Sequence, residues 1–168
     1  MVQRLLPNAQ ADALLALEPE ITAKIVRRSV GIKAQIVSQD EKETTGLRII
    51  LNYGHTVGHA LEASTAYDSY LHGEAVAVGM VAAAEIGRRM GITSEDIIKE
   101  QNDLLSRFGL PTKCPGIDLD AVMAAMSLDK KTSGRAIKWV LLEEIGRTVL
   151  RDDVPIALVE EVVRSLAK

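Results

Sequence analysis

Apolar side chains recur every three or four residues over most of the chain, a spacing typical of amphipathic helices. Caps, glycines and prolines mark the expected helix ends. The predicted helices cover residues 9–18, 19–38, 47–63, 74–90, 93–108, 118–126 and 155–166. Gly54 and Gly58 lie within the third of these helices, where each costs about 1 kcal/mol of helix stability relative to alanine. Their uncovered backbone allows another helix or a ligand to approach closely.

One stretch near the C-terminus favours strands instead. Residues 136–142 and 147–151 are β-prone, and Glu144, Ile145 and Gly146 supply a turn between them. A polar loop is expected before the first strand, over residues 129–134. The sequence therefore predicts a mainly α fold, a single helical domain over residues 1–168 with one small β-hairpin.

Composition supports a packed helical protein and argues against several functional classes. Hydrophobic residues make up 47% and aromatic residues 3%, so aliphatic side chains must fill the core. The formal net charge of -3, without a basic concentration, argues against a nucleic-acid partner. The longest apolar run, residues 75–84, is about half of a membrane span, and no signal peptide is recognisable. We therefore expect a soluble cytoplasmic protein without a membrane partner.

The only cysteine, Cys114, allows neither a disulfide nor a thiolate metal site. It stands beside Pro115, where an inert core or loop thiol is a better explanation than a nucleophile.

All three histidines of the chain fall between positions 55 and 72. His55 and His59 are four residues apart and therefore share a helix face, and His72 starts the following predicted helix. Zinc binds neutral imidazoles, and catalytic zinc sites commonly use three protein ligands. Spacing alone nominates His55, His59 and His72 as metal ligands. The alternative is that they are ordinary surface or core residues satisfied by hydrogen bonds.

The same window contains a long motif. Residues 46–62 read Gly-Leu-Arg-x-x-Leu-Asn-x-Gly-His-Thr-x-Gly-His-Ala-Leu-Glu, and residues 71–80 read Leu-His-Gly-Glu-Ala-Val-Ala-x-Gly-Met. The motif resembles that of 3-dehydroquinate synthase. Similarity to this family extends to residues 28–34, 40–43, 109–111, 129–131 and 140–146. The resemblance covers nearly the whole chain and implies the helical C-terminal domain of the dehydroquinate synthase-like fold.

The resemblance assigns different roles to the histidines. In the family a Glu and two His bind a divalent metal, Zn2+ or Co2+, and the two His match His55 and His72. His59 corresponds to a catalytic residue that assists proton transfer near the substrate phosphate. Spacing and resemblance therefore disagree about His59, and we favour the proton-transfer role because a ligand set completed by Glu leaves His59 free.

Further site residues follow from the same resemblance. Arg48 and Asn52 correspond to residues that hold the substrate phosphate, a task suited to the donor fork of a guanidinium. Lys33 and Glu43 match active-site residues, and one of Lys130 or Lys131 would contact the substrate from its loop. For the lysines and Glu43, which lie outside the central motif, a solvated surface charge is the alternative.

The implied reaction belongs to the shikimate pathway of aromatic amino-acid biosynthesis. The family converts 3-deoxy-D-arabino-heptulosonate 7-phosphate, a sugar phosphate, to 3-dehydroquinate and phosphate, and a bound NAD accepts and returns a hydride. Its NAD-binding α/β domain and its Glu ligand precede the helical domain. This chain has no Gly-rich dinucleotide fingerprint. We therefore expect a C-terminal domain that is inactive alone, works with an NAD-binding domain and forms a homodimer.

Three alternatives stay open. Other sugar-phosphate cyclases share the motif and mechanism. Iron-dependent alcohol or glycerol dehydrogenases share the architecture but lack the long motif. A stand-alone helical metal-binding module is the third, and a gene without upstream α/β coding sequence would favour it.

Overall fold

A computed structural model describes residues 8–42, 44–66, 69–133 and 136–168. The chain divides into two compact units, Met1–Leu51 and Asn52–Lys168, which are described separately. The described part is mainly helical and contains one two-stranded antiparallel sheet, which confirms the predicted fold class.

The first unit contains helices α1 (Asn8–Leu15) and α2 (Pro19–Gln39) and most of a 3-10 helix, η2 (Leu47–Asn52). Pro19 begins α2, where its missing N–H has no helical partner to lose. None of the α2 residues is buried, and the predicted helix over 19–38 is confirmed to within one residue.

A loop after α2 is closed by a single carboxylate. Asp40 is buried, and its side chain accepts hydrogen bonds from the backbone N–H groups of Thr45 (2.9 Å) and Arg48 (3.1 Å). The hydrogen bond from the Thr45 N–H, and to a smaller degree the one from the Arg48 N–H, lowers the pKa of Asp40 below its ordinary value. Burial opposes this effect. The Asp40 carboxylate thereby ties the end of α2 to the start of η2.

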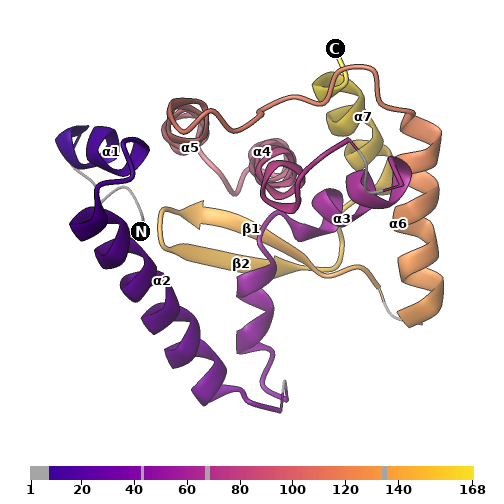
Figure 1. The fold of residues 1–168 in the computed structure, drawn as a ribbon. Coiled ribbons are helices and arrows are strands. Elements are labelled where there is room, and N and C mark those ends of the chain that lie inside the picture. Colours follow the sequence, from indigo (N-terminus) through magenta and orange to yellow (C-terminus); the bar gives the residue numbers. More distant parts are fainter. Residues whose placement is uncertain (1–7, 43, 67–68, 134–135) are drawn as a thin grey trace. The chain divides into compact units, whose positions relative to one another are not determined.

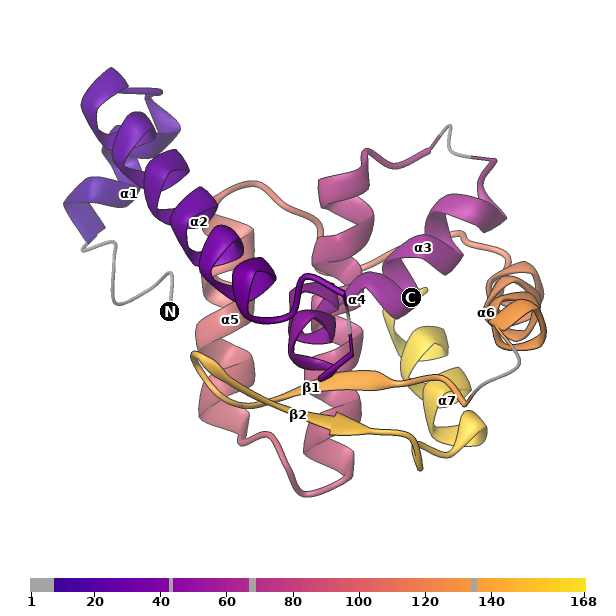
Figure 2. The same ribbon diagram turned by 90° about the horizontal axis from the view of Figure 1, so that it is seen from below.

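In the second unit, helix α4 (His72–Arg89) runs between α5 (Glu95–Arg107) and α7 (Ile156–Leu166), with α3 (His55–Ser64) packed on it (Figures 1 and 2). The hairpin of β1 (Trp139–Glu144) and β2 (Arg147–Arg151) lies against α4, and α6 (Leu119–Ser133) packs on α3 and α7. The Ala- and Gly-rich sequence of α4 suits this central position, because small side chains let several elements approach it.

The predicted helix over 47–63 is wrong as a single element. The structure has η2, a turn at Tyr53 and Gly54, and then α3. Gly54 has φ of +82°, a left-handed conformation that ends one helix and starts the next. Arg48 and Asn52 therefore lie on a 3-10 helix, whose three-residue turn does not place residues four apart on one face.

Close backbone contact explains why Gly54 adopts this conformation. A Cβ atom on Gly79 of α4 would lie 1.9 Å from the Gly54 carbonyl oxygen, and one on Gly54 would lie 2.8 Å from the Met80 nitrogen. A Cβ on Gly58 would lie 3.1 Å from the Val76 Cα. The close approach predicted for Gly54 and Gly58 is confirmed, and the neighbour is α4.

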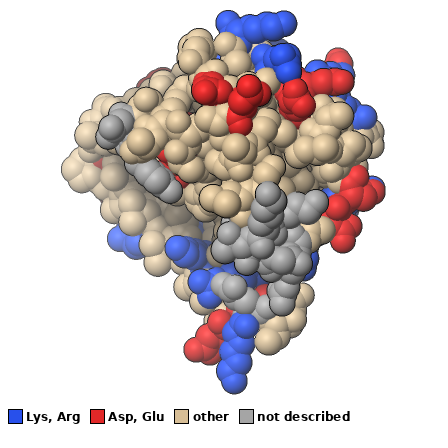
Figure 3. Space-filling view, turned by 90° about the vertical axis from the view of Figure 1, so that its right-hand side faces the viewer, with Lys and Arg blue, Asp and Glu red and all other residues tan. Residues whose placement is uncertain are grey.

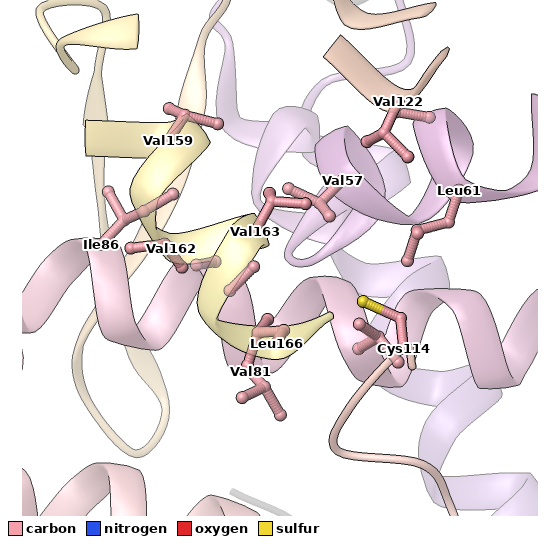
Figure 4. Close-up of a cluster of buried hydrophobic side chains, with 14 of the residues drawn as sticks. Val57, Leu61, Val81, Ile86, Cys114, Val122, Val159, Val162, Val163 and Leu166 are labelled. Atoms are coloured by element: carbon pink, nitrogen blue, oxygen red, sulfur yellow. The ribbon is translucent and has the colours of Figure 1, made fainter. Parts of the chain in front are cut away.

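The core of the second unit is aliphatic, as the composition predicted. Figure 4 shows side chains from α3, α4, α6 and α7 in one buried cluster that includes Cys114. Cys114 is fully buried, and its backbone N–H donates to the Leu166 carbonyl (2.9 Å). Burial raises the pKa of the Cys114 thiol to about 11, which supports the expected inert core thiol.

The β-hairpin predicted near the C-terminus is confirmed. β1 and β2 pair antiparallel with an irregularity between Leu142 and Glu144, but residues 139–142 are all buried and do not alternate. Ser94 caps α5 by accepting a hydrogen bond from the Ile97 N–H (3.4 Å).

At α6, Asp118 caps the helix start by accepting a hydrogen bond from the Ala121 N–H (3.1 Å). The helix continues to Ser133, so the loop predicted over 129–134 is wrong for residues 129–133.

None of the described helices combines the length and apolar content needed to cross a bilayer. On the face in Figure 3, acidic and basic side chains both stand among uncharged ones.

Candidate functional site

The three predicted histidines come together at the junction of α3 and α4. His55 is the first residue of α3, His59 lies one turn later, and His72 is the first residue of α4. The ring centroid of His55 lies 5.2 Å from that of His59 and 5.4 Å from that of His72. The centroids of His59 and His72 are 5.9 Å apart. The glycine-mediated packing of α3 on α4 makes this approach possible.

A buried carboxylate orients His72. Glu62 is 7% exposed, and its two carboxylate oxygens lie 3.1 and 3.3 Å from Nδ1 of His72. An ionised carboxylate only accepts hydrogen bonds, so Nδ1 of His72 carries the proton and Nε2 is left for a ligand. A carboxylate behind a histidine is the usual support of a metal-binding imidazole.

A backbone carbonyl orients His55 in the same way. Nδ1 of His55 lies 3.3 Å from the carbonyl oxygen of Tyr53, which can only accept a hydrogen bond, so Nδ1 is the protonated nitrogen. Burial lowers the pKa of His55, the bond to Tyr53 opposes this effect, and the nearby His59 and His72 lower the pKa further. The neutral imidazole is therefore favoured, with Nε2 unprotonated, and this is the form that binds metal ions.

His59 differs from its two neighbours. Its ring is exposed, as is that of His72, but among the described residues no hydrogen bond to the His59 ring is found. Potential ligand atoms of His59, Glu62 and His72 lie within 4.8 Å of one another. Since the Glu62 carboxylate is buried and bonded to His72, we interpret Glu62 as the support of a ligand rather than a ligand. The group within 4.8 Å does not include His55, whose ring centroid nevertheless lies 5.2 Å from that of His59 and 5.4 Å from that of His72. Two imidazoles held through Nδ1, with a third nearby, are donors that suit a divalent metal.

The other predicted site residues are placed as follows. Asn52 is exposed at the end of η2. Lys33 is exposed on α2 and Arg48 is half-buried on η2, both in the separately described first unit. Glu43 lies outside the described residues, as do the side chains of Lys130 and Lys131, whose backbone continues α6.

Sequence reasoning missed the residues that orient the histidines. Glu62 follows His55 by seven residues, two helical turns, and that spacing was a usable signal for a shared face. Tyr53 orients His55 through its backbone carbonyl, and no sequence pattern indicates such a role. The alignment of the rings depends on contacts between α3 and α4 that only the fold supplies.

Comparisons with known proteins identify the family of this chain. Residues 2–132 match the model of the family described as 3-dehydroquinate synthase C-terminal. The 3-dehydroquinate synthase of Nostoc punctiforme is 42% identical over 160 residues, which cover 95% of this chain and 44% of that relative. The enzyme of Acidithiobacillus ferrooxidans is 44% identical over 154 residues, 92% of this chain and 42% of the relative. The chain spans less than half the length of these relatives.

Solved structures share the fold. ValA, a 2-epi-5-epi-valiolone synthase from Streptomyces hygroscopicus with NAD+ and Zn2+ bound, matches 94% of this chain and 44% of its own with a TM-score of 0.79 at 23% identity. A 2-deoxy-scyllo-inosose synthase complexed with carbaglucose-6-phosphate, NAD+ and Co2+ matches 70% of this chain and 35% of its own, with a TM-score of 0.61 at 30% identity. From the motif, the helical fold and these matches, the chain belongs to the 3-dehydroquinate synthase family and corresponds to its C-terminal domain.

Proposed function

We propose that this chain is the metal- and phosphate-binding part of a 3-dehydroquinate synthase, a lyase that releases phosphate from 3-deoxy-D-arabino-heptulosonate 7-phosphate. The observation that carries the proposal is the convergence of three histidines, two of them held through Nδ1, within the family motif. Identities of 42% and 44% to relatives named 3-dehydroquinate synthase support the assignment.

In this proposal His55 and His72 bind the metal through Nε2, together with a carboxylate from the remaining part of the protein. Zinc or cobalt bound there would polarise and orient the hydroxyl groups of the substrate. Co2+ in the 2-deoxy-scyllo-inosose synthase supports a divalent ion. Glu62 and the Tyr53 carbonyl hold the two rings in the orientation that ligation requires.

His59 is proposed to move a proton between the substrate and its phosphate. The His59 ring lies next to the other two but, among the described residues, no hydrogen bond holds it, which supports this role. Arg48 and Asn52 are proposed to bind the phosphate, with Lys33, Glu43 and one of Lys130 or Lys131 completing the charged surroundings. The sugar-phosphate analogue bound to the 2-deoxy-scyllo-inosose synthase supports a sugar-phosphate substrate.

We propose that NAD binds to the part of the protein that corresponds to the remaining length of the relatives. The described residues form one two-stranded antiparallel sheet, whereas dinucleotides bind at the ends of parallel strands. The 168-residue chain tested alone is then inactive. Two exposed valines one turn apart on α2, Val26 and Val30, support a further protein contact on that helix, such as the expected homodimer.

A second candidate is a related sugar-phosphate cyclase with another product. The 30% identity to 2-deoxy-scyllo-inosose synthase favours it over a dehydrogenase or a stand-alone module. The two cyclase activities share the metal and phosphate chemistry and differ in the substrate that each consumes.

The test is reconstitution of this chain with the N-terminal half of a relative. We expect phosphate release that needs NAD, metal and both halves, with 3-deoxy-D-arabino-heptulosonate 7-phosphate as substrate. A His55→Ala, His72→Ala double variant is the control for metal dependence. No gain over the separate halves, or phosphate release by the chain alone, would contradict the proposal, and activity only with another sugar phosphate would favour the second candidate.

A further inference from the structure

We propose that Gln101 of α5 is a positioning residue for His55, acting through Tyr53. Gln101 holds the Tyr53 side chain, Tyr53 presents its carbonyl to Nδ1 of His55, and Nε2 of His55 is thereby kept free for a ligand. The consequence for metal binding rests on the proposed function, whereas the positioning itself is a property of this chain alone.

The contacts form a closed set between three elements. The Tyr53 hydroxyl donates to the Gln101 Oε1 (2.6 Å), and the Gln101 Nε2 donates to the Met80 carbonyl of α4 (3.2 Å). The Tyr53 hydroxyl also lies 3.2 Å from the Met80 carbonyl. A hydroxyl has one proton, and the shorter contact takes it, so the Gln101 amide serves as acceptor and donor at once. The loop before α3 is thus tied to α4 and α5.

Burial of Gln101 makes these hydrogen bonds necessary. Gln101 is 5% exposed, and the other buried residue of α5 is the apolar Leu105. A buried amide needs hydrogen-bond partners, whereas an apolar side chain of similar volume would not. Burial raises the pKa of the Tyr53 hydroxyl above its ordinary value, with the Gln101 bond opposing that effect, so the hydroxyl stays protonated and donates.

The turn between Tyr53 and His55 transmits the constraint. Gly54 lies between them in the left-handed conformation, and its backbone is pressed against Met80 and Val76 of α4. Gln101 fixes the side chain on one side of the turn, and α4 fixes the backbone next to it. The Tyr53 carbonyl then has a defined position 3.3 Å from Nδ1 of His55. Release of the Tyr53 side chain removes one of the two constraints.

The test compares three variants of the 168-residue chain. Gln101→Met removes both amide bonds at similar volume, and Tyr53→Phe removes the hydroxyl. Thr93→Val is the matched control. Thr93 is buried and donates to the Leu142 carbonyl, and it takes no part in the hydrogen bonds that join Tyr53, Gln101 and Met80. Thermal unfolding identifies the variants that fold, and either folded test variant suffices.

The readout is the tautomer of His55 in metal-free, histidine-15N-labelled protein, observed by long-range 15N–1H correlation above the titration range of histidine. The signal is assigned by its loss in His55→Gln. We expect His55 in the Nδ1–H form in the parent chain and in Thr93→Val. We expect a mixture with the Nε2–H form in Gln101→Met and Tyr53→Phe. An unchanged His55 tautomer in both test variants, or a parent chain without the Nδ1–H form, would overturn the inference.

A second arm measures the affinity for Co2+ by calorimetry. Loss of an orienting partner weakens metal sites by about tenfold or more. We expect Co2+ affinity to fall by this factor in Gln101→Met and Tyr53→Phe and to stay unchanged in Thr93→Val. Unchanged Co2+ affinity in the two test variants would overturn the claim that Gln101 supports metal binding. A parent chain that binds no Co2+ would contradict the proposed metal site, while the tautomer result would still decide the role of Gln101.

Discussion

The bond between Glu62 and His72 gives the first prediction at the scale of single residues. Glu62→Gln keeps the shape of the side chain but removes the charge that strengthens the bond to Nδ1 of His72. We expect Zn2+ or Co2+ affinity to fall about tenfold. Glu85→Gln is the control, because Glu85 pairs with Arg88 and Arg89 at the far end of α4. Equal affinity of Glu62→Gln and the parent chain, measured by calorimetry, would remove Glu62 from the site.

Asp40 gives a pH-dependent prediction. Its pKa is lowered in the folded chain, so its contribution to stability is present above the ordinary pKa of an aspartate and is lost as the pH falls through the folded pKa. Asp40→Asn should therefore lower Tm at neutral pH, and the difference from the parent should shrink in acid. The exposed Glu41→Gln is the control. A Tm difference for Asp40→Asn that is constant with pH would show that ionisation of Asp40 is not its cause.

At the scale of elements, two glycines of one helix are predicted to respond in opposite directions. A Cβ on Gly79 would meet the Gly54 carbonyl at 1.9 Å, while one on Gly73 would meet nothing within 4 Å. Gly79→Ala should cost about 1–3 kcal/mol or more, because α3 must move away from α4. Gly73→Ala should be neutral or stabilising by up to about 1 kcal/mol. Urea unfolding checks both, and a tolerated Gly79→Ala would contradict the close packing.

Predictability from the sequence also differs among the elements. The ends of α2, α4 and α7 lie within two residues of their predicted positions, because Pro19, Gly91 and Pro155 interrupt the helical pattern. The break at Gly54 was not predicted, because a left-handed glycine is set there by contact with α4. The extension of α6 to Ser133 was missed because polar residues were interpreted as a loop, although lysine and aspartate are also tolerated within helices.

At the scale of the whole molecule, the sequence located the site but not its construction. The clustering of the three histidines could be predicted because two share a helix face and the third starts the next helix. The roles proposed for them came from the motif. Glu62, Tyr53 and Gln101 could not be assigned supporting roles from the sequence, because those roles exist only once α3, α4 and α5 are packed. Tertiary contacts, more than local patterns, orient the imidazoles.

The buried thiol of Cys114 lets the coupling between site and core be measured. Cys114 lies where α3, α4, α6 and α7 meet, so a thiol reagent reaches it only when this core opens (Figure 4). A metal that binds only the folded chain stabilises it by about 2.7 kcal/mol at a concentration of about 100 Kd. If opening and closing are fast relative to labelling, the labelling rate follows the open population and should fall about a hundredfold. The His55→Ala, His72→Ala variant has the same cysteine and reveals any direct effect of metal on the thiol. Protection of the parent but not of this variant would establish that the histidine pair binds the metal and stabilises the whole core. Equal labelling rates of the parent chain with and without metal would contradict it.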